Sequence, residues 1–211
     1  MGNKKILAIE STSNVCSVGL SINNEIIAEY SIFLKNYHDK MLAELTNRIL
    51  TDFNIKAEEL DFVAVSSGPG SFTGIRIGGS IAMGLAFGEK SKTINIPTIN
   101  VLAFNSLEIA KQLNKNKILV TINSHKNLYY TQLFNLELNP ISEIELIDEK
   151  QILKNDFENT LLISNFNSKN HLLNELEKLS ASKILNYVKS LIEIKTDELF
   201  EPIYIQEFNP K

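Results

Sequence analysis

Hydrophobic and polar positions alternate along the beginning of the chain in a way that predicts three strands, at 4–10, 15–22 and 25–33. From Cys16 to Ile22 every second residue is apolar and the residues between are small or polar, which is typical of a strand with one buried face. Asn23 and Asn24 tolerate left-handed backbone conformations. They therefore predict a tight hairpin between the second and third strands.

A helical period follows at 39–53, where an apolar stripe alternates with charged residues. The run Phe62 to Val65 predicts a buried strand, the residues after Ser71 predict a helix that runs to about 88, and 93–96 predicts another strand. Three strands, helix, strand, helix, strand is the order of a ribonuclease-H-like domain. The sequence therefore predicts an α/β fold with a first domain over 1–100.

The remainder predicts a second, reduced ribonuclease-H-like domain over 101–211. Its patterns indicate a helix at 101–113, strands at 117–123, 128–138, 141–147 and 160–164, helices at 171–179 and 183–194, and an extended segment at 202–206. This half contains no glycine. We therefore expect no loop in it that lets a ligand approach the backbone closely.

Seven of the nine glycines lie between Ser66 and Gly88. Two of them flank Pro69 in a loop that ends at Ser71, the expected N-cap of the following helix. A helix N-terminus presents free N–H groups that favour an anion. The turn after the first strand is a second candidate, although it also fits a polar hairpin opening without a ligand. The candidate nucleotide or anion contacts are Glu10, Ser11, Thr12, Ser13, Gly68, Gly70 and Ser71.

Small residues recur at every fourth position of the predicted helix after Ser71. Glycine costs a helix up to about 1 kcal/mol relative to alanine, so we expect a compensating close approach of another backbone, from the same domain or from a second subunit. The alternative is a core helix with no partner. For Arg76 the alternatives are an ion pair across an interface and a solvated charge. The candidate partner-interface residues are Met41, Leu42, Leu45, Ile49, Phe72, Gly74, Ile75, Arg76, Gly78, Ile81 and Ala82.

Charge and composition narrow the classes of function. The chain has 21 Lys and Arg against 25 Asp and Glu, a formal net charge of −4. This balance argues against a protein that holds RNA by itself, because non-specific affinity for RNA comes from phosphate neutralisation. The sequence has no apolar run long enough for a bilayer, and Cys16 has no second cysteine to pair with. We expect a cytoplasmic protein without a membrane partner.

Two motifs carry a resemblance to a known family. The stretches ILAIESTSNVCSVGL (6–20) and SSGPGSFTGIRIG (66–78), at this separation, resemble the TsaB family, also called YeaZ, of bacterial proteins needed to make threonylcarbamoyladenosine in tRNA. The resemblance is strong over 6–107. It implies two ribonuclease-H-like domains of the actin, Hsp70 and sugar kinase superfold.

The resemblance also implies a role as a non-catalytic scaffolding subunit. TsaB-like proteins pair with a larger catalytic paralogue, TsaD, and an ATPase, TsaE, joins them. Their first two helices, here 39–53 and 71–88, form the surface for pairing with TsaD or with a second copy in a homodimer. The tRNA is then reached only through the complex. No cofactor is expected on this chain alone, and ATP or ADP is a candidate at the interface of the complex.

The alternative class is a stand-alone enzyme of the same superfold, either a glycoprotease-like metallopeptidase or a small kinase. TsaD-like chains carry two metal-binding histidines four residues apart, and Val101 and Asn105 stand at those positions here. His38, His125 and His171 are far apart in sequence, so we expect no metal site. A kinase would need a second phosphate loop, and 121–127 lacks the aspartate–glycine pair of such a loop. We therefore expect no catalysis by this chain alone.

Overall fold

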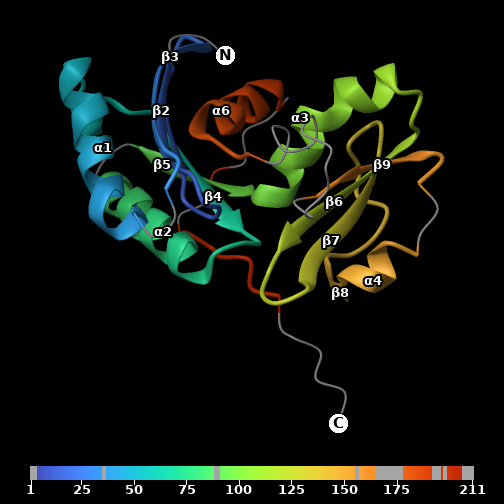
Figure 1. Ribbon diagram of the computed structural model, residues 1–211. Coiled ribbons are helices and arrows are strands. Elements are labelled where there is room, and N and C mark those ends of the chain that lie inside the picture. The colour runs from blue at the N-terminus through green and yellow to red at the C-terminus, as the bar shows by residue number, and fades with distance from the viewer. Residues whose placement is uncertain are drawn as a thin grey trace. The chain divides into compact units, whose positions relative to one another are not determined.

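The computed structural model describes residues 4–34, 37–87, 91–154, 157–164, 178–191, 196 and 199–205. The chain forms two compact units (Figure 1). The first consists of Met1–Thr98 together with Leu179–Pro202, and the second of Ile99–Lys178 together with Ile203–Lys211. The chain thus leaves the first unit after Thr98 and returns to it at Leu179.

A five-stranded sheet in the order β3-β2-β1-β4-β5 forms the centre of the first unit. The first three strands are antiparallel, and the last two run parallel to β1. Asn23 and Asn24 connect β2 and β3 with φ angles of 55° and 67°, which confirms the predicted tight hairpin. The strands are β1 (Lys5–Glu10), β2 (Cys16–Ile22), β3 (Glu25–Ile32), β4 (Phe62–Gly68) and β5 (Lys92–Pro97).

Helices cover both faces of this sheet (Figure 1). Helices α1 (His38–Asp52) and α2 (Phe72–Ala86) pack on one face, and a short 3-10 helix, η1 (Ala57–Glu59), precedes β4. The alternation in β2 directs Cys16, Val18 and Leu20 into the core beneath α1 and α2. The intervening residues of β2 face α6 (Ala181–Ser190) on the other side.

The second unit repeats the strand order of the first with a four-stranded sheet, β8-β7-β6-β9. Strands β6, β7 and β8 are antiparallel neighbours, and β9 runs parallel to β6. Its buried apolar residues include Ile118, Val120, Phe134 and Ile163, and Tyr129 and Ile152 form a further buried cluster. The elements are α3 (Thr98–Gln112), β6 (Lys117–Asn123), β7 (Leu128–Asn135), β8 (Glu145–Asp148), α4 (Glu149–Ile152) and β9 (Thr160–Ile163).

The units differ from the expected division at 1–100 and 101–211 in two places, of which the shift of the first boundary to Thr98 is small. Leu179–Pro202 belongs to the first unit, because the apolar side of α6 packs on the face of the sheet that α1 and α2 leave uncovered. Gly19 on β2 permits this contact, since a Cβ there would lie 3.0 Å from the Cβ of Ala181. Sequence periodicity detects the apolar side of such a helix but not the sheet that it covers.

Smaller differences concern the later elements. The strand expected at 141–147 begins only at Glu145, and residues 202–205 form no strand. Most of the helix expected at 171–179 lies outside the described residues.

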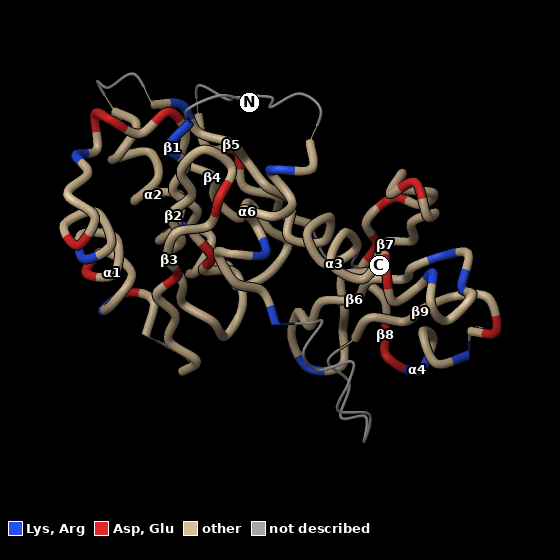
Figure 2. The backbone as a smooth tube through the Cα atoms, turned by 90° about the horizontal axis from the view of Figure 1, so that it is seen from above, with Lys and Arg blue, Asp and Glu red and all other residues tan. Residues whose placement is uncertain are grey.

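Lys and Arg residues are interspersed with Asp and Glu along the described backbone (Figure 2). Among the described helices, none has the length and apolarity needed to cross a bilayer.

Candidate functional site

The turn after β1 lies against the loop after β4 and the beginning of α2. The N–H of Ser71 donates to the carbonyl oxygen of Thr12 at 2.7 Å, and the Ser11 hydroxyl donates to the carbonyl oxygen of Gly74 at 2.8 Å. Gly68 has a φ of 103°, a conformation that favours glycine. The structure therefore brings the predicted anion-contact residues together, and contact with a nucleotide stays a prediction.

Glu10 lies at the centre of this turn with no solvent-exposed surface. Its Oε1 accepts hydrogen bonds from the Thr12 N–H at 2.8 Å, the Thr12 hydroxyl at 2.9 Å and the Ser13 N–H at 3.1 Å. Its Oε2 accepts one from the Ser66 hydroxyl. Burial raises the pKa of Glu10 above its ordinary value of 4.5, and the hydrogen bonds act in the opposite direction. The donors of the turn are thus already engaged by a carboxyl group of the same chain.

Most of the small-residue positions of α2 are filled from within the first unit. A Cβ at Gly74 or Gly78 would collide with Ser11, and a Cβ at Gly79 would collide with the ring of Phe200. Ala82 is likewise buried. The backbone that approaches the glycine stripe at Gly74 is therefore the turn after β1, which is the first of the two origins expected, and contact of a partner with this stripe stays a prediction.

The other predicted interface residues fall into two groups. Leu42, Ile49 and Ile75 are buried in the core of the first unit, so a partner cannot contact them unless the fold opens. The reason is that the apolar stripe of α1 faces the sheet. Arg76 stacks on Phe72, with its guanidinium carbon 3.7 Å from the ring centroid. Partner contact stays a prediction for those that keep exposed surface, which are Met41, Leu45, Phe72, Arg76 and Ile81.

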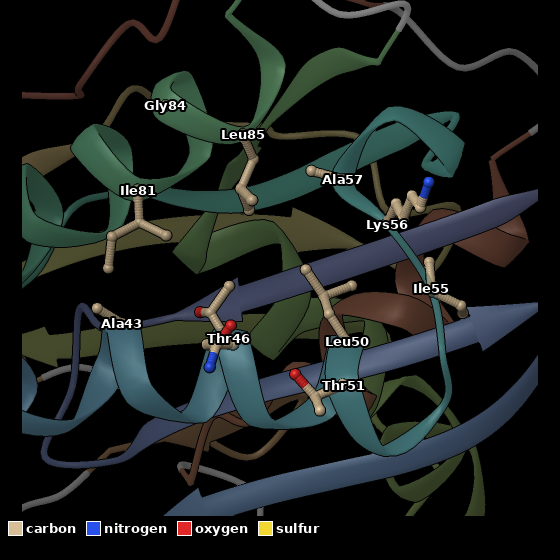
Figure 3. Close-up of a pocket in the computed structure, with 11 residues that line it drawn as sticks. Ala43, Thr46, Leu50, Thr51, Ile55, Lys56, Ala57, Ile81, Gly84 and Leu85 are labelled. Atoms are coloured by element: carbon tan, nitrogen blue, oxygen red, sulfur yellow. The ribbon is translucent and has the colours of Figure 1, made fainter.

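Sequence reasoning missed a groove between α1, α2 and η1 (Figure 3). Its volume is about 470 Å³. Gly84 lies in its wall, and a Cβ added there would meet no atom within 4 Å. The signal available in the sequence was Gly84, a helix glycine outside the stripe of small residues at 74, 78, 82 and 86. The lining residues are Ala43, Thr46, Asn47, Leu50, Thr51, Ile55, Lys56, Ala57, Ile81, Gly84 and Leu85.

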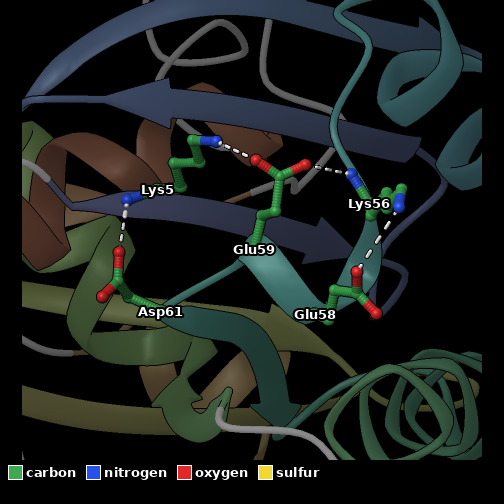
Figure 4. Close-up of polar contacts among 5 residues, drawn as sticks. All are labelled: Lys5, Lys56, Glu58, Glu59 and Asp61. Atoms are coloured by element: carbon green, nitrogen blue, oxygen red, sulfur yellow. Dashed lines mark hydrogen bonds and ion pairs between the residues drawn. The ribbon is translucent and has the colours of Figure 1, made fainter.

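Polar contacts hold the η1 edge of this groove in place (Figure 4). The Lys5 ammonium lies 2.7 Å from Oε1 of Glu59, and the backbone N–H of Lys56 donates to Oε2 of the same carboxylate at 2.9 Å. The hydrogen bond from Lys5 lowers the pKa of Glu59. Asp61 accepts a hydrogen bond from the Lys5 N–H at 2.8 Å. The edge that carries Lys56 and Ala57 is thereby attached to β1.

The positions where TsaD-like chains carry metal-binding histidines lie on α3. Val101 is fully buried, and the Asn105 side-chain amide donates to the Val101 carbonyl oxygen at 2.7 Å. Neither position therefore supplies the imidazole that a TsaD-like metal site would need. Nε2 of His38 lies 3.1 Å from the Val15 carbonyl oxygen. Within the described residues, no three His, Cys, Asp or Glu side chains are grouped so that they could hold a metal ion.

Two ribonuclease-H-like sheets, with a turn after β1 and a glycine loop after β4, define a protein of the actin, Hsp70 and sugar kinase superfold. A Pseudomonas aeruginosa structure described as similar to the peptidase YeaZ agrees with this fold. Its TM-score is 0.73 at 15% sequence identity, and the match covers 96% of this chain and all of that one.

Sequence comparisons identify the family. Residues 27–190 match the family model described as TsaD, tRNA N6-adenosine threonylcarbamoyltransferase. The tRNA threonylcarbamoyladenosine biosynthesis protein TsaB of Buchnera aphidicola subsp. Acyrthosiphon pisum is 32% identical over 157 residues, which are 73% of this chain and 69% of that protein. TsaB of Haemophilus influenzae is 30% identical over 63% of this chain and 55% of that protein. The chain belongs to the TsaB (YeaZ) family, within the wider group that the TsaD model describes.

Proposed function

We propose that the chain is a non-catalytic subunit in the biosynthesis of threonylcarbamoyladenosine in tRNA, and that it pairs with a TsaD-like paralogue through the groove between α1 and α2. The observation that carries the proposal is Gly84. A glycine inside a helix costs up to about 1 kcal/mol relative to alanine, and no atom of the described chain occupies the space beside it. The missing side chain leaves room for one from outside.

The chemistry of the groove favours a protein helix as the occupant. Its lining is mostly alanine, threonine and aliphatic side chains, with Lys56 as the charged residue among them. Because the chain matches the TsaD model over 27–190, a TsaD-like paralogue has a related pair of helices to offer. Two such pairs can pack as helix on helix, at interaxial distances of about 8–10 Å that small residues permit.

The absence of independent catalysis is part of the same proposal. Val101 and Asn105 replace the two expected histidines, so the imidazole ligands of a TsaD-like metal site are missing at these positions. In this proposal the paralogue performs the transfer and binds the tRNA, a TsaE-like ATPase joins the pair, and the complex works in the cytoplasm. A nucleotide at the interface, ATP or ADP, would be held mainly by the partner.

Co-purification with the TsaD-like paralogue of the same organism tests the proposal. The Cβ of Gly84→Leu meets no atom of the described chain, and leucine favours a helix more than glycine does, so we expect a melting temperature no lower than that of the wild type and a loss of pairing of about tenfold or more. Asn186→Leu adds the same side chain to an exposed position of α6 and should pair like the wild type. Equal pairing by both variants would refute the groove as the docking surface.

A homodimer through the same groove is the second candidate. Sedimentation of the isolated chain at several concentrations separates the two possibilities. If Gly84→Leu abolishes self-association and leaves binding to the paralogue unchanged, the groove is a self-pairing surface and the proposal for the paralogue is wrong.

A further inference from the structure

The turn after β1 has the donors of an anion-binding site. Two consecutive backbone N–H groups, those of Thr12 and Ser13, point at one oxygen of Glu10, and the hydroxyls of Thr12 and Ser66 complete the set. Successive backbone N–H groups of this kind form the concave sites that bind phosphates and other anions in many proteins. Here all four donors reach the same carboxyl group, and those of Thr12 and Ser66 are buried.

We infer that Glu10 is an internal ligand of this turn: its carboxyl group takes the position that an external anion would take, and it closes the turn to nucleotide phosphates. The inference goes beyond the proposed function and does not depend on it. Once the Glu10 side chain is removed, the four donors would accept a small carboxylate such as acetate in its place.

The position of Glu10 explains why an external anion cannot compete. The carboxyl group is covalently attached to the end of β1, so its local concentration at the donors is far higher than that of a dissolved ligand. A phosphate entering beside it would find these four donors already engaged. Glu10 also connects separate elements of the first unit. It accepts a hydrogen bond from Ser66 on β4, and another from the Thr12 hydroxyl, which itself lies 3.2 Å from the hydroxyl of Thr98 after β5.

Removal of this side chain has a specific consequence. In Glu10→Ala the N–H groups of Thr12 and Ser13 and the Ser66 hydroxyl lose their shared acceptor, and the Thr12 hydroxyl keeps only the Thr98 hydroxyl, which is destabilising. The space vacated by the side chain matches a short carboxylate, so an added anion restores the lost hydrogen bonds. A ligand that binds only the folded state raises the melting temperature in proportion to the logarithm of its concentration.

The test measures melting temperatures in sodium acetate and in sodium chloride of equal ionic strength. For Glu10→Ala we expect acetate to raise the melting temperature by about 2–4 °C over chloride at concentrations several-fold above its dissociation constant. The wild type should show no difference between the two salts. Glu59→Ala, which removes an exposed carboxylate that also accepts two hydrogen bonds, should show none either. A folded Glu10→Ala that responds equally to acetate and chloride would overturn the inference.

A second measurement uses the wild type and does not require Glu10→Ala to fold. The amide resonances of Thr12 and Ser13 are followed by NMR during addition of inorganic phosphate and, separately, of magnesium ATP. We expect no saturable change at either amide. A saturable shift at both would show that the turn takes an external phosphate while Glu10 is present, and the inference would be wrong.

Discussion

The backbone N–H of Ala181 donates a hydrogen bond to the hydroxyl oxygen of Ser17, 164 positions earlier in the chain, at 2.6 Å. Ser17 lies on β2, and Ala181 is the first residue of α6. The N-cap residue of α6, Ser180, makes no side-chain capping bond. A strand residue therefore satisfies one of the free N–H groups at the start of this helix, and α6 is capped by the sheet that it covers.

Ser17→Ala should therefore destabilise the first unit. The substitution leaves a buried N–H without an acceptor, and we expect the free energy of unfolding to fall by about 1–2 kcal/mol. Ser180→Ala changes a neighbouring serine that makes no capping bond and should cost less than about 0.5 kcal/mol. Urea denaturation followed by circular dichroism compares the two variants. Equal losses would show that the contact from β2 does not stabilise α6.

Gly74→Ala and Gly84→Ala should change stability in opposite directions. A methyl group at Gly74 collides with the Ser11 backbone, and we expect a loss of about 2 kcal/mol or more. At Gly84 the methyl group enters open space, so the better helix propensity of alanine should raise the free energy of unfolding by about 0.5–1 kcal/mol. Thermal unfolding of the isolated chain measures both. A destabilised Gly84→Ala would mean that the groove is narrower than described.

The C-terminal segment is anchored on α2 and β5 by Phe200. Its ring lies on Gly79, its N–H lies 3.2 Å from the sulfur of Met83, and Asn95 donates to the carbonyl oxygen of Leu199 at 3.2 Å. We expect Phe200→Ala and Gly79→Ala each to destabilise the first unit. The double variant should lose less than the sum, because the new methyl group occupies space that the ring has left. A double-mutant cycle should give a coupling of about 0.5–3 kcal/mol, and additive losses would contradict the contact.

Glu10 gives the stability of the chain a defined dependence on pH. Its pKa in the folded state is raised by burial above 4.5, so the native state holds this proton more tightly than the unfolded state does. Its contribution is therefore complete below pH 4.5 and is lost as the pH rises through the folded pKa. Urea denaturation at a series of pH values measures this. Between pH 4.5 and the folded-state pKa of Glu10, the free energy of unfolding should fall more steeply with pH in the wild type than in Glu10→Gln. Parallel curves would show that burial does not raise this pKa.

Local patterns were enough to predict much of the first unit. The alternation around Val18 predicted β2, the two asparagines predicted the hairpin, and Ser71 accepts a hydrogen bond from the Gly74 N–H at 3.2 Å, as an N-cap does. Each of these features depends on residues that are close in the sequence. The family also followed from two short motifs, because both lie in the loops that characterise this fold.

The site was harder to predict for a physical reason. A glycine in a helix indicates that something comes close, but not whether it belongs to the same chain. Gly74 belongs to the stripe of small residues and Gly84 does not, but this spacing alone does not reveal that the first contacts Ser11 and the second faces open space. The groove itself combines residues of α1, η1 and α2, so it exists only after these elements pack. The same holds for Ser17 and Ala181, which share a contact only in the folded sheet.

The return of Leu179–Pro202 to the first sheet has a consequence for how the protein is made. A ribosome synthesises β1 long before it synthesises α6, so the nascent chain carries a sheet with one uncovered side until α6 has been made. Chains terminated at about residue 100 would keep that side exposed, and exposed sheet surface of this kind promotes aggregation.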